Sequence, residues 1–223
     1  MAVPGLNEWM KRTFVLAPLV AGEAAVYVFF VLSGFVLYLT FDAKDGSAPG
    51  PFIVKRIARI YPPVLAIVII AAAAMVAVDI EPVLTPWFQR SWSRDMTLGL
   101  LVDHLTLSDN LLALNMVLWS LSVEIRFSIL FPLLAFAVKR YPTASMAGSF
   151  VIYLVCRVAR GHLDHYAYDP VLTFQYVWLF VSGAWLALKR EELQQAFASL
   201  PKWVGGLLIL AATCLASFSP NHY

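Results

Sequence analysis

Two charged residues interrupt the otherwise apolar stretch WSLSVEIRFSILFPLLAFAV, which covers residues 119–138. Glu124 and Arg126 are two positions apart, so on a helix they point to nearly opposite sides and do not pair with each other. A charge at this depth in a bilayer costs at least about 2.5 kcal/mol and must face protein or a wet cavity. There a carboxyl group can transfer protons. The alternative is a structural ion pair between Glu124 and a cation on another helix.

The serines of this stretch divide between the same two sides. Ser120, Glu124 and Ser128 follow each other at four-residue intervals and share one stripe of a helix. We expect this stripe to face an internal cavity, with Glu124 as the catalytic carboxylate and Ser120 next to the substrate. Arg126 lies on the other stripe with Ser122. We expect Arg126 to be structural, paired with another helix or a lipid phosphate.

A basic cluster precedes two prolines in the segment PFIVKRIARIYPP, residues 51–63. Lys55, Arg56 and Arg59 are three and four positions apart, so a helix brings them to one face. Pro62 and Pro63 cannot donate to the preceding carbonyls, which predicts that one helix ends there and a membrane helix begins. Cations beside a helix N-terminus suit phosphate groups, and guanidinium groups suit bidentate contacts. The alternative is a set of anchors for the inner leaflet.

Small residues interrupt a third apolar stretch, VYVFFVLSGFVLYLT, residues 26–40. Ser33 and Gly34 allow two helix backbones to approach closely, and Ser33 can bond to a neighbouring helix. Helix packing is the ordinary explanation of such a pair, and we assign the same packing role to Trp119.

The four histidines lie later in the sequence, at positions 104, 162, 165 and 222. His104 follows Asp103, and we expect it to contact the acceptor substrate. His162 and His165 flank Asp164 in a short loop, a spacing that could hold a metal. No fourth ligand is evident there, so we predict a solvated interfacial loop and no metal site.

The composition indicates that these residues lie on membrane helices. Hydrophobic residues make up 61% of the 223 positions and charged residues only 13%, more apolar side chain than a soluble domain of this size can bury. The net charge of +2 is too small to suggest nucleic acid. We predict an all-α, polytopic transmembrane bundle in one domain, 1–223, that contacts membrane lipid. Its spans are expected at residues 24–41, 61–80, 117–138, 143–160, 171–188 and 203–219.

The loops between these spans indicate an orientation. If residues 24–41 run from outside to inside, the inner loops carry nine lysines and arginines and the outer loops carry six. Residues 81–116 then form the longest polar excursion, on the outer side, with an amphipathic part at 98–116 that lies in the membrane interface.

Together these motifs resemble the acyltransferase 3 family of membrane O-acyltransferases. The resemblance rests on FFVLSGF (29–35), KRIARIYPP (55–63) and WSLSVEIRF (119–127), which occur in the family's order and approximate spacing, and on FVSGAWLAL (180–188), which resembles a later family helix. It implies a multi-pass enzyme of the bacterial inner membrane with no bound cofactor. Such an enzyme takes an acyl group, usually acetyl, from acyl-CoA (acetyl-CoA) as co-substrate. The acceptor is a hydroxyl of an exported carbohydrate or lipid-linked glycan.

The resemblance also implies roles for individual residues. Arg56 and Arg59 match the RxxR pair associated with the acyl donor, and Lys55 lies next to them. Glu124 matches the glutamate of the WSLSVE motif, where it would orient the acceptor hydroxyl or a catalytic histidine. The family's histidine lies on a helix before the SGF helix, and about ten spans are usual. We therefore expect this chain to be truncated at both ends and inactive by itself.

Two other classes of function remain open from the residues. A proton-coupled transporter or exporter subunit would use Glu124 as a proton relay and the arginines as a substrate gate. An inverted repeat would favour that class, but WSLSVE has no counterpart in the other half of the sequence. A membrane fragment that packs against another subunit is the third possibility.

Overall fold

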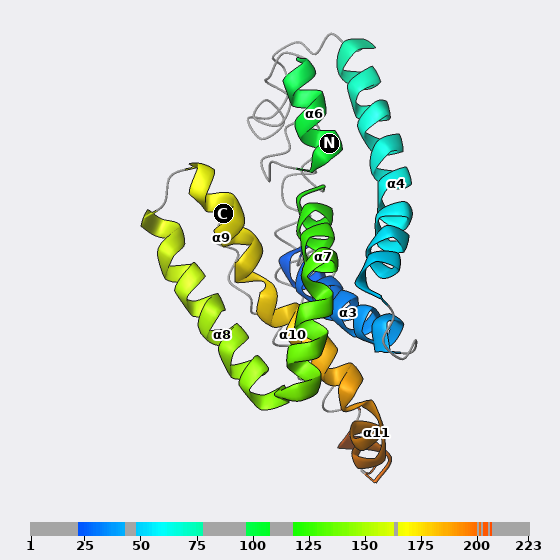
Figure 1. Ribbon diagram of the computed structural model, residues 1–223, viewed down its shortest axis with the longest axis vertical. Helices are drawn as coiled ribbons and strands as arrows, with labels where there is room; N and C mark the ends of the chain where they lie inside the picture. The colour runs from blue at the N-terminus through cyan, green and yellow to red at the C-terminus, as the bar shows by residue number, and fades with distance from the viewer. Residues whose placement is uncertain are drawn as a thin grey trace.

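The computed structural model describes residues 22–42, 48–77, 97–107, 118–162, 165–199, 201, 203–204 and 206, and these are helical apart from short connections. Figure 1 shows the arrangement of the helices. In chain order they are α3 (Gly22–Asp42), α4 (Pro49–Ala77), α6 (Leu98–Thr106), α7 (Leu118–Arg140), α8 (Pro142–Ala159), the 3₁₀ turn η1 (Arg160–His162), α9 (His165–Gln175), α10 (Val177–Leu188) and α11 (Arg190–Ala198).

Five segments of these helices are long and apolar enough to cross a bilayer. They are Ala24–Phe41, Pro49–Ala74, Leu118–Arg140, Pro142–His162 and Pro170–Leu188. The prediction of an all-α membrane bundle is confirmed, and five of the six expected spans have a counterpart. The sixth, at 203–219, lies almost entirely outside the described residues, as does most of the 81–116 excursion apart from α6.

The surface and the interior have the polarity expected in lipid. Large apolar side chains such as Ile70, Leu133 and Val158 are about two-thirds exposed on α4, α7 and α8. Several polar side chains are buried instead, including Arg56, Ser122 and Glu124. Hydrocarbon solvates apolar side chains and cannot pair polar groups, so a bundle in a membrane turns its polar residues inward.

Helix α4 corrects one expectation from the sequence. Pro62 and Pro63 do not end a helix, because α4 is continuous from Pro49 to Ala77 and contains both. A transmembrane helix tolerates proline where its neighbours compensate, and the apolar run after Pro63 favours a continuing helix in lipid. The span therefore begins near residue 49 instead of 61, and among the described helices no N-terminus lies beside the arginines.

The closest helix packing joins α3 and α10. A Cβ atom added to Gly34 would collide with the backbone of Phe180, and one added to Gly183 would collide with the backbone of Val31. Both helices also pack on α7. The ring centroid of Phe180 lies 4.3 Å from that of Phe127 and 5.3 Å from that of Phe30. The two glycines thus allow α3 and α10 to form, with α7, the main apolar core.

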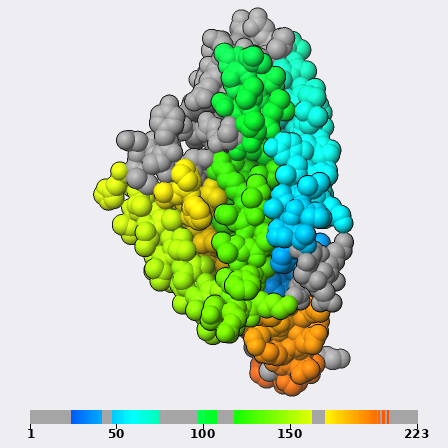
Figure 2. All heavy atoms as spheres, viewed as in Figure 1, coloured from blue at the N-terminus to red at the C-terminus, as the bar shows by residue number. Residues whose placement is uncertain are grey.

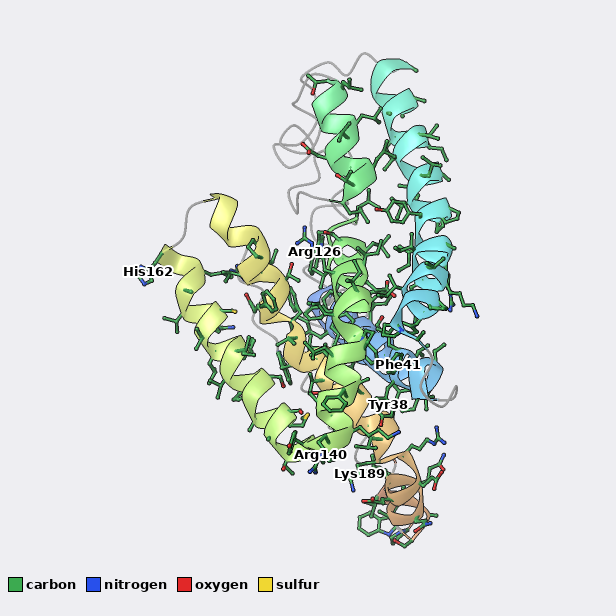
Figure 3. All side chains as sticks on the ribbon, in the orientation of Figure 1. Tyr38, Phe41, Arg126, Arg140, His162 and Lys189 are labelled. Carbon is green, nitrogen blue, oxygen red and sulfur yellow. The ribbon has the colours of Figure 1, made fainter. Side chains whose placement is uncertain are left out.

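Helix α7, like α10, packs against several other helices. It contacts α3, α4, α8 and α10, and in Figure 1 it runs through the centre of the molecule with α4 beside it. Arg140 and Lys189, at the ends of α7 and α10, lie at the same end of the bundle, as Figure 3 shows. These positions agree with the inner loops inferred from the sequence.

Candidate functional site

A pocket of about 300 Å³ lies where α3, α4 and α7 meet. Its lining combines charged and polar groups with apolar side chains. The polar members are Ser33, Arg56, Arg59 and Glu124, and the apolar members are Phe29, Leu32, Val36, Ile60, Pro63 and Leu121. The three motifs separated in the sequence therefore contribute to one site.

The charged groups of the pocket differ in exposure. Arg56 and Glu124 are each 8% exposed, whereas Arg59 is exposed. The Glu124 carboxylate interacts electrostatically with both guanidinium groups, and more strongly with Arg56. Two cations against one carboxylate leave one net positive charge in the pocket, which favours an anionic ligand.

Arg56 and Glu124 lie near the N-terminal ends of their helices, α4 and α7. Arg56 lies about 10 Å along α4 from Pro49, at 1.5 Å per residue. Glu124 lies about 9 Å along α7 from Leu118. With the orientation expected from the loops, α4 begins on the inner side and α7 begins on the outer side. The pocket is then where residues near the inner end of one span meet residues near the outer end of another.

Arg126 lies on the other side of α7. Its Nη1 donates a hydrogen bond to Oγ1 of Thr173 in α9 at 2.7 Å, and its Nη2 donates to the carbonyl oxygen of Leu107 at 3.2 Å. The Ser122 hydroxyl donates to the same carbonyl at 2.8 Å. Figure 3 shows Arg126 on the side of α7 away from α4. Arg126 and Ser122 thus hold the C-terminal end of α6 against α7.

Leu107, the acceptor of those two bonds, has a backbone φ of 53°, a conformation that costs energy for a branched side chain. Its side chain is buried with Ile60, Val64 and Leu118. The hydrogen bonds to its carbonyl and this burial offset the cost of the backbone conformation.

His104 does not line the pocket. Its side chain is 1% exposed within α6, the helix that packs on α4. We expected this residue to touch the acceptor because it belongs to a polar excursion. Three-residue spacing instead places it on the same face of α6 as Leu101, which packs against the apolar cluster that contains Ile60, Val64 and Leu118.

Several other expected site residues also lie outside the lining of the pocket. Lys55 is exposed, because one residue along a helix rotates the side chain by about 100° away from Arg56. Ser120 is partly buried, and Ser128 is 1% exposed. The pocket face of α7 runs through Leu121 and Glu124, three residues apart, instead of through the four-residue stripe of serines.

Of the remaining predicted residues, Gly34 and Trp119 have packing positions, and the histidine loop does not. Gly34 lies in the close approach of α3 to α10. Trp119 meets the ring of Phe30 edge-on, with centroids 6.0 Å apart, and lies 5.6 Å from Tyr176. His162 is exposed and projects from the end of α8 in Figure 3. Asp164 and the side chain of His165 lie outside the described residues.

The sequence reasoning did not identify the apolar lining of the pocket. Phe29 and Val36 flank Ser33 at helical spacing, and Ile60 and Pro63 follow Arg56 and Arg59 four residues later. This spacing was available from the sequence once Ser33 and Arg59 were chosen as reference positions. The residues look like ordinary lipid-facing side chains, however, and only the arrangement of the helices distinguishes them.

Comparison with known proteins identifies the family. The family model described as an acyltransferase domain, that of acyltransferase 3, matches residues 2–223. No curated protein matches the chain. No solved structure matches it either. Since the family model covers nearly the whole sequence, the chain belongs to the acyltransferase 3 family and is a membrane acyltransferase domain.

Proposed function

We propose that the protein transfers an acetyl group from acetyl-CoA to a hydroxyl of an exported carbohydrate or lipid-linked glycan, in the inner membrane of a bacterium. One observation carries the proposal: Arg56, Arg59 and Glu124, from two motifs far apart in the sequence, line the same pocket. The arginines provide donors for the phosphates of coenzyme A, and the carboxylate provides an acceptor for a hydroxyl proton.

The reaction needs the thioester and the acceptor hydroxyl close together. The acceptor oxygen attacks the thioester carbonyl, a C–O bond forms and the C–S bond breaks. The proton of the hydroxyl ends on the sulfur of coenzyme A. In this proposal Glu124 orients the hydroxyl and accepts its hydrogen bond during the attack. Ser33 lies in the same pocket and offers a second hydrogen-bonding group.

The position of the pocket supports transfer across the membrane. Arg56 comes from the part of α4 expected on the inner side, where acyl-CoA is available. Glu124 comes from the part of α7 expected toward the outer side, where an exported glycan is available. Because one pocket contains both residues, donor and acceptor could meet there without a large movement of the helices.

The test measures the transfer of acetyl groups to glycan in membrane vesicles. The vesicles come from cells in which the gene for each variant replaces the natural gene. The vesicles expose their cytoplasmic face and receive acetyl-CoA labelled in the acetyl group. We expect label on glycan with the wild type and loss of that label with Arg56→Ala and Arg59→Ala combined. Arg157→Ala is the control, because Arg157 is exposed on α8, outside the lining of the pocket, and its guanidinium donates a hydrogen bond to the Tyr153 hydroxyl one turn earlier.

Two results would contradict the proposal. The first is the absence of protein-dependent acetylation in any glycan fraction, with the protein present in the membrane. The second is movement of a solute or of protons that depends on Glu124 without transfer of an acyl group, which would favour a transporter.

A further inference from the structure

The pocket is a cleft that opens sideways between α3 and α4. Both helices pack on α7, and α3 meets α4 where the ring of Phe41 packs edge-on against Phe52, with centroids 5.3 Å apart. The α3 residues that line the pocket are also accessible from outside the bundle, since Phe29, Leu32 and Val36 are 37%, 56% and 43% exposed. These side chains therefore form the edge of an opening.

The two helices on either side of this opening expose mainly apolar side chains, apart from Lys55 and Arg59 on α4. Val28 on α3 and Val54, Ile57 and Leu65 on α4 are exposed, and all belong to segments that can cross a bilayer. Figure 2 shows α4 and α7 as neighbouring parts of one face of the molecule. An opening surrounded by such side chains faces hydrocarbon rather than water.

Two of the three charged groups, Arg56 and Glu124, lie at the inner part of the cleft and are almost fully buried. The exposed residues of the lining are mainly apolar, with Arg59 as the exposed cation among them. A ligand that fits this arrangement has a hydrocarbon chain and a polar or anionic group at one end of it. The volume of about 300 Å³ is at the lower end for pockets that bind small ligands. It suits a chain and its head group, but not a whole coenzyme A.

We propose that this cleft holds the acyl chain of the donor, which enters between α3 and α4 from the bilayer, and that Leu32 and Val36 determine how long a chain is accepted. This inference rests on the proposed transfer reaction and extends its donor from acetyl to longer acyl groups. The chain lies along the apolar residues of α3, and the thioester lies near Glu124. The bonds formed and broken are those of the acetyl reaction.

The test compares acetyl-CoA with octanoyl-CoA as donors in the same membrane vesicles. We expect the wild type to transfer both groups. Leu32→Trp and Val36→Trp narrow the cleft, so each should lower octanoyl transfer at least about tenfold more than it lowers acetyl transfer, since pockets discriminate single methylene groups by 10- to 200-fold. Leu32→Ala widens the cleft and should raise the ratio of octanoyl to acetyl transfer.

Val28→Trp is the matched control. Val28 lies on the same helix and is 58% exposed, but it does not line the pocket. Its substitution should not change the ratio of the two donors. Because Leu32 is also largely exposed, its substitution by tryptophan should be tolerated by the fold, and thermal unfolding of the purified variants checks this.

The outcomes separate this inference from the proposed function. Transfer of acetyl but not octanoyl by the wild type, or an equal effect of Leu32→Trp on both donors, would overturn the inference and leave the acetyl reaction intact. A change in preference among glycan acceptors, with no change in donor preference, would overturn it as well and assign the cleft to a lipid-linked acceptor. If neither donor is transferred by the wild type, the proposed function itself fails.

Discussion

The side chains of Glu124 and Arg126, two residues apart in α7, have separate surroundings. Glu124 lines the pocket between α3, α4 and α7, where it interacts with Arg56. Arg126 donates a hydrogen bond to Thr173 at 2.7 Å and another to the carbonyl of Leu107. Of the two charges in the middle of an apolar sequence, Glu124 thus belongs to the candidate reaction site and Arg126 to a contact between helices.

Loss of Arg126 should lower stability more than activity. Arg126→Gln removes a charged donor from Thr173 and Leu107, at a cost of about 1–3 kcal/mol in the free energy of unfolding. Thermal unfolding in detergent measures this cost. Thr173→Val, which removes one of the two acceptors, should show a smaller loss. Unchanged unfolding together with strongly reduced transfer would place Arg126 in the reaction instead.

The two arginines of the pocket should differ in their effects on the donor. Arg59→Ala should raise the KM for acyl-CoA by about 10- to 100-fold, the equivalent of one hydrogen bond to a charged group. Arg56→Ala should also destabilise the fold, because it leaves Glu124 buried near a single, exposed cation. Arg56→Lys keeps the charge and should restore folding but only part of the binding, since lysine cannot make a bidentate contact.

Lys55 provides a graded comparison for this prediction. It is exposed and outside the lining of the pocket, so Lys55→Ala should raise the KM for acyl-CoA less than Arg59→Ala does. A larger effect at Lys55 than at Arg59 would mean that the donor binds outside the pocket.

The close approach of α3 and α10 should not tolerate a methyl group. Gly34→Ala and Gly183→Ala each place a Cβ against the backbone of the other helix, so the helices must separate. We expect a loss of about 1–3 kcal/mol in the free energy of unfolding for each, as for other overpacked sites. Gly148→Ala on α8 is the control. A Cβ there meets nothing within 4 Å, so this variant should be as stable as the wild type or slightly more stable.

Apolar length predicted the membrane helices well, because a bilayer requires a nearly fixed number of apolar residues. The expected span at 24–41 matches the segment Ala24–Phe41. Helical geometry likewise predicted that Glu124 and Arg126 would face different surroundings. Both inferences depend on properties of a single helix, and such properties are present in the local sequence.

The sequence was a poorer guide where neighbouring helices determine the outcome. Pro62 and Pro63 stop many helices, but here α4 continues through them. His104 belongs to the amphipathic stretch 98–116 and was expected to contact the acceptor, but in α6 its side chain is buried. The cleft between α3 and α4 arises from how both helices pack on α7. Such packing between helices cannot be predicted from the residue pattern of a single segment.

Transfer by Glu124→Gln is the most direct test of the pocket as the reaction site. The change keeps the size of the side chain and its hydrogen-bonding reach but removes the charge and the basicity. In vesicles supplied with labelled acyl-CoA, we expect transfer per folded molecule to fall by about 10²- to 10⁴-fold, the range for loss of an acid or base group. Expression and thermal stability should stay near those of the wild type. Near-normal transfer by a poorly folded Glu124→Gln protein would contradict the account and make Glu124 half of a buried ion pair with Arg56.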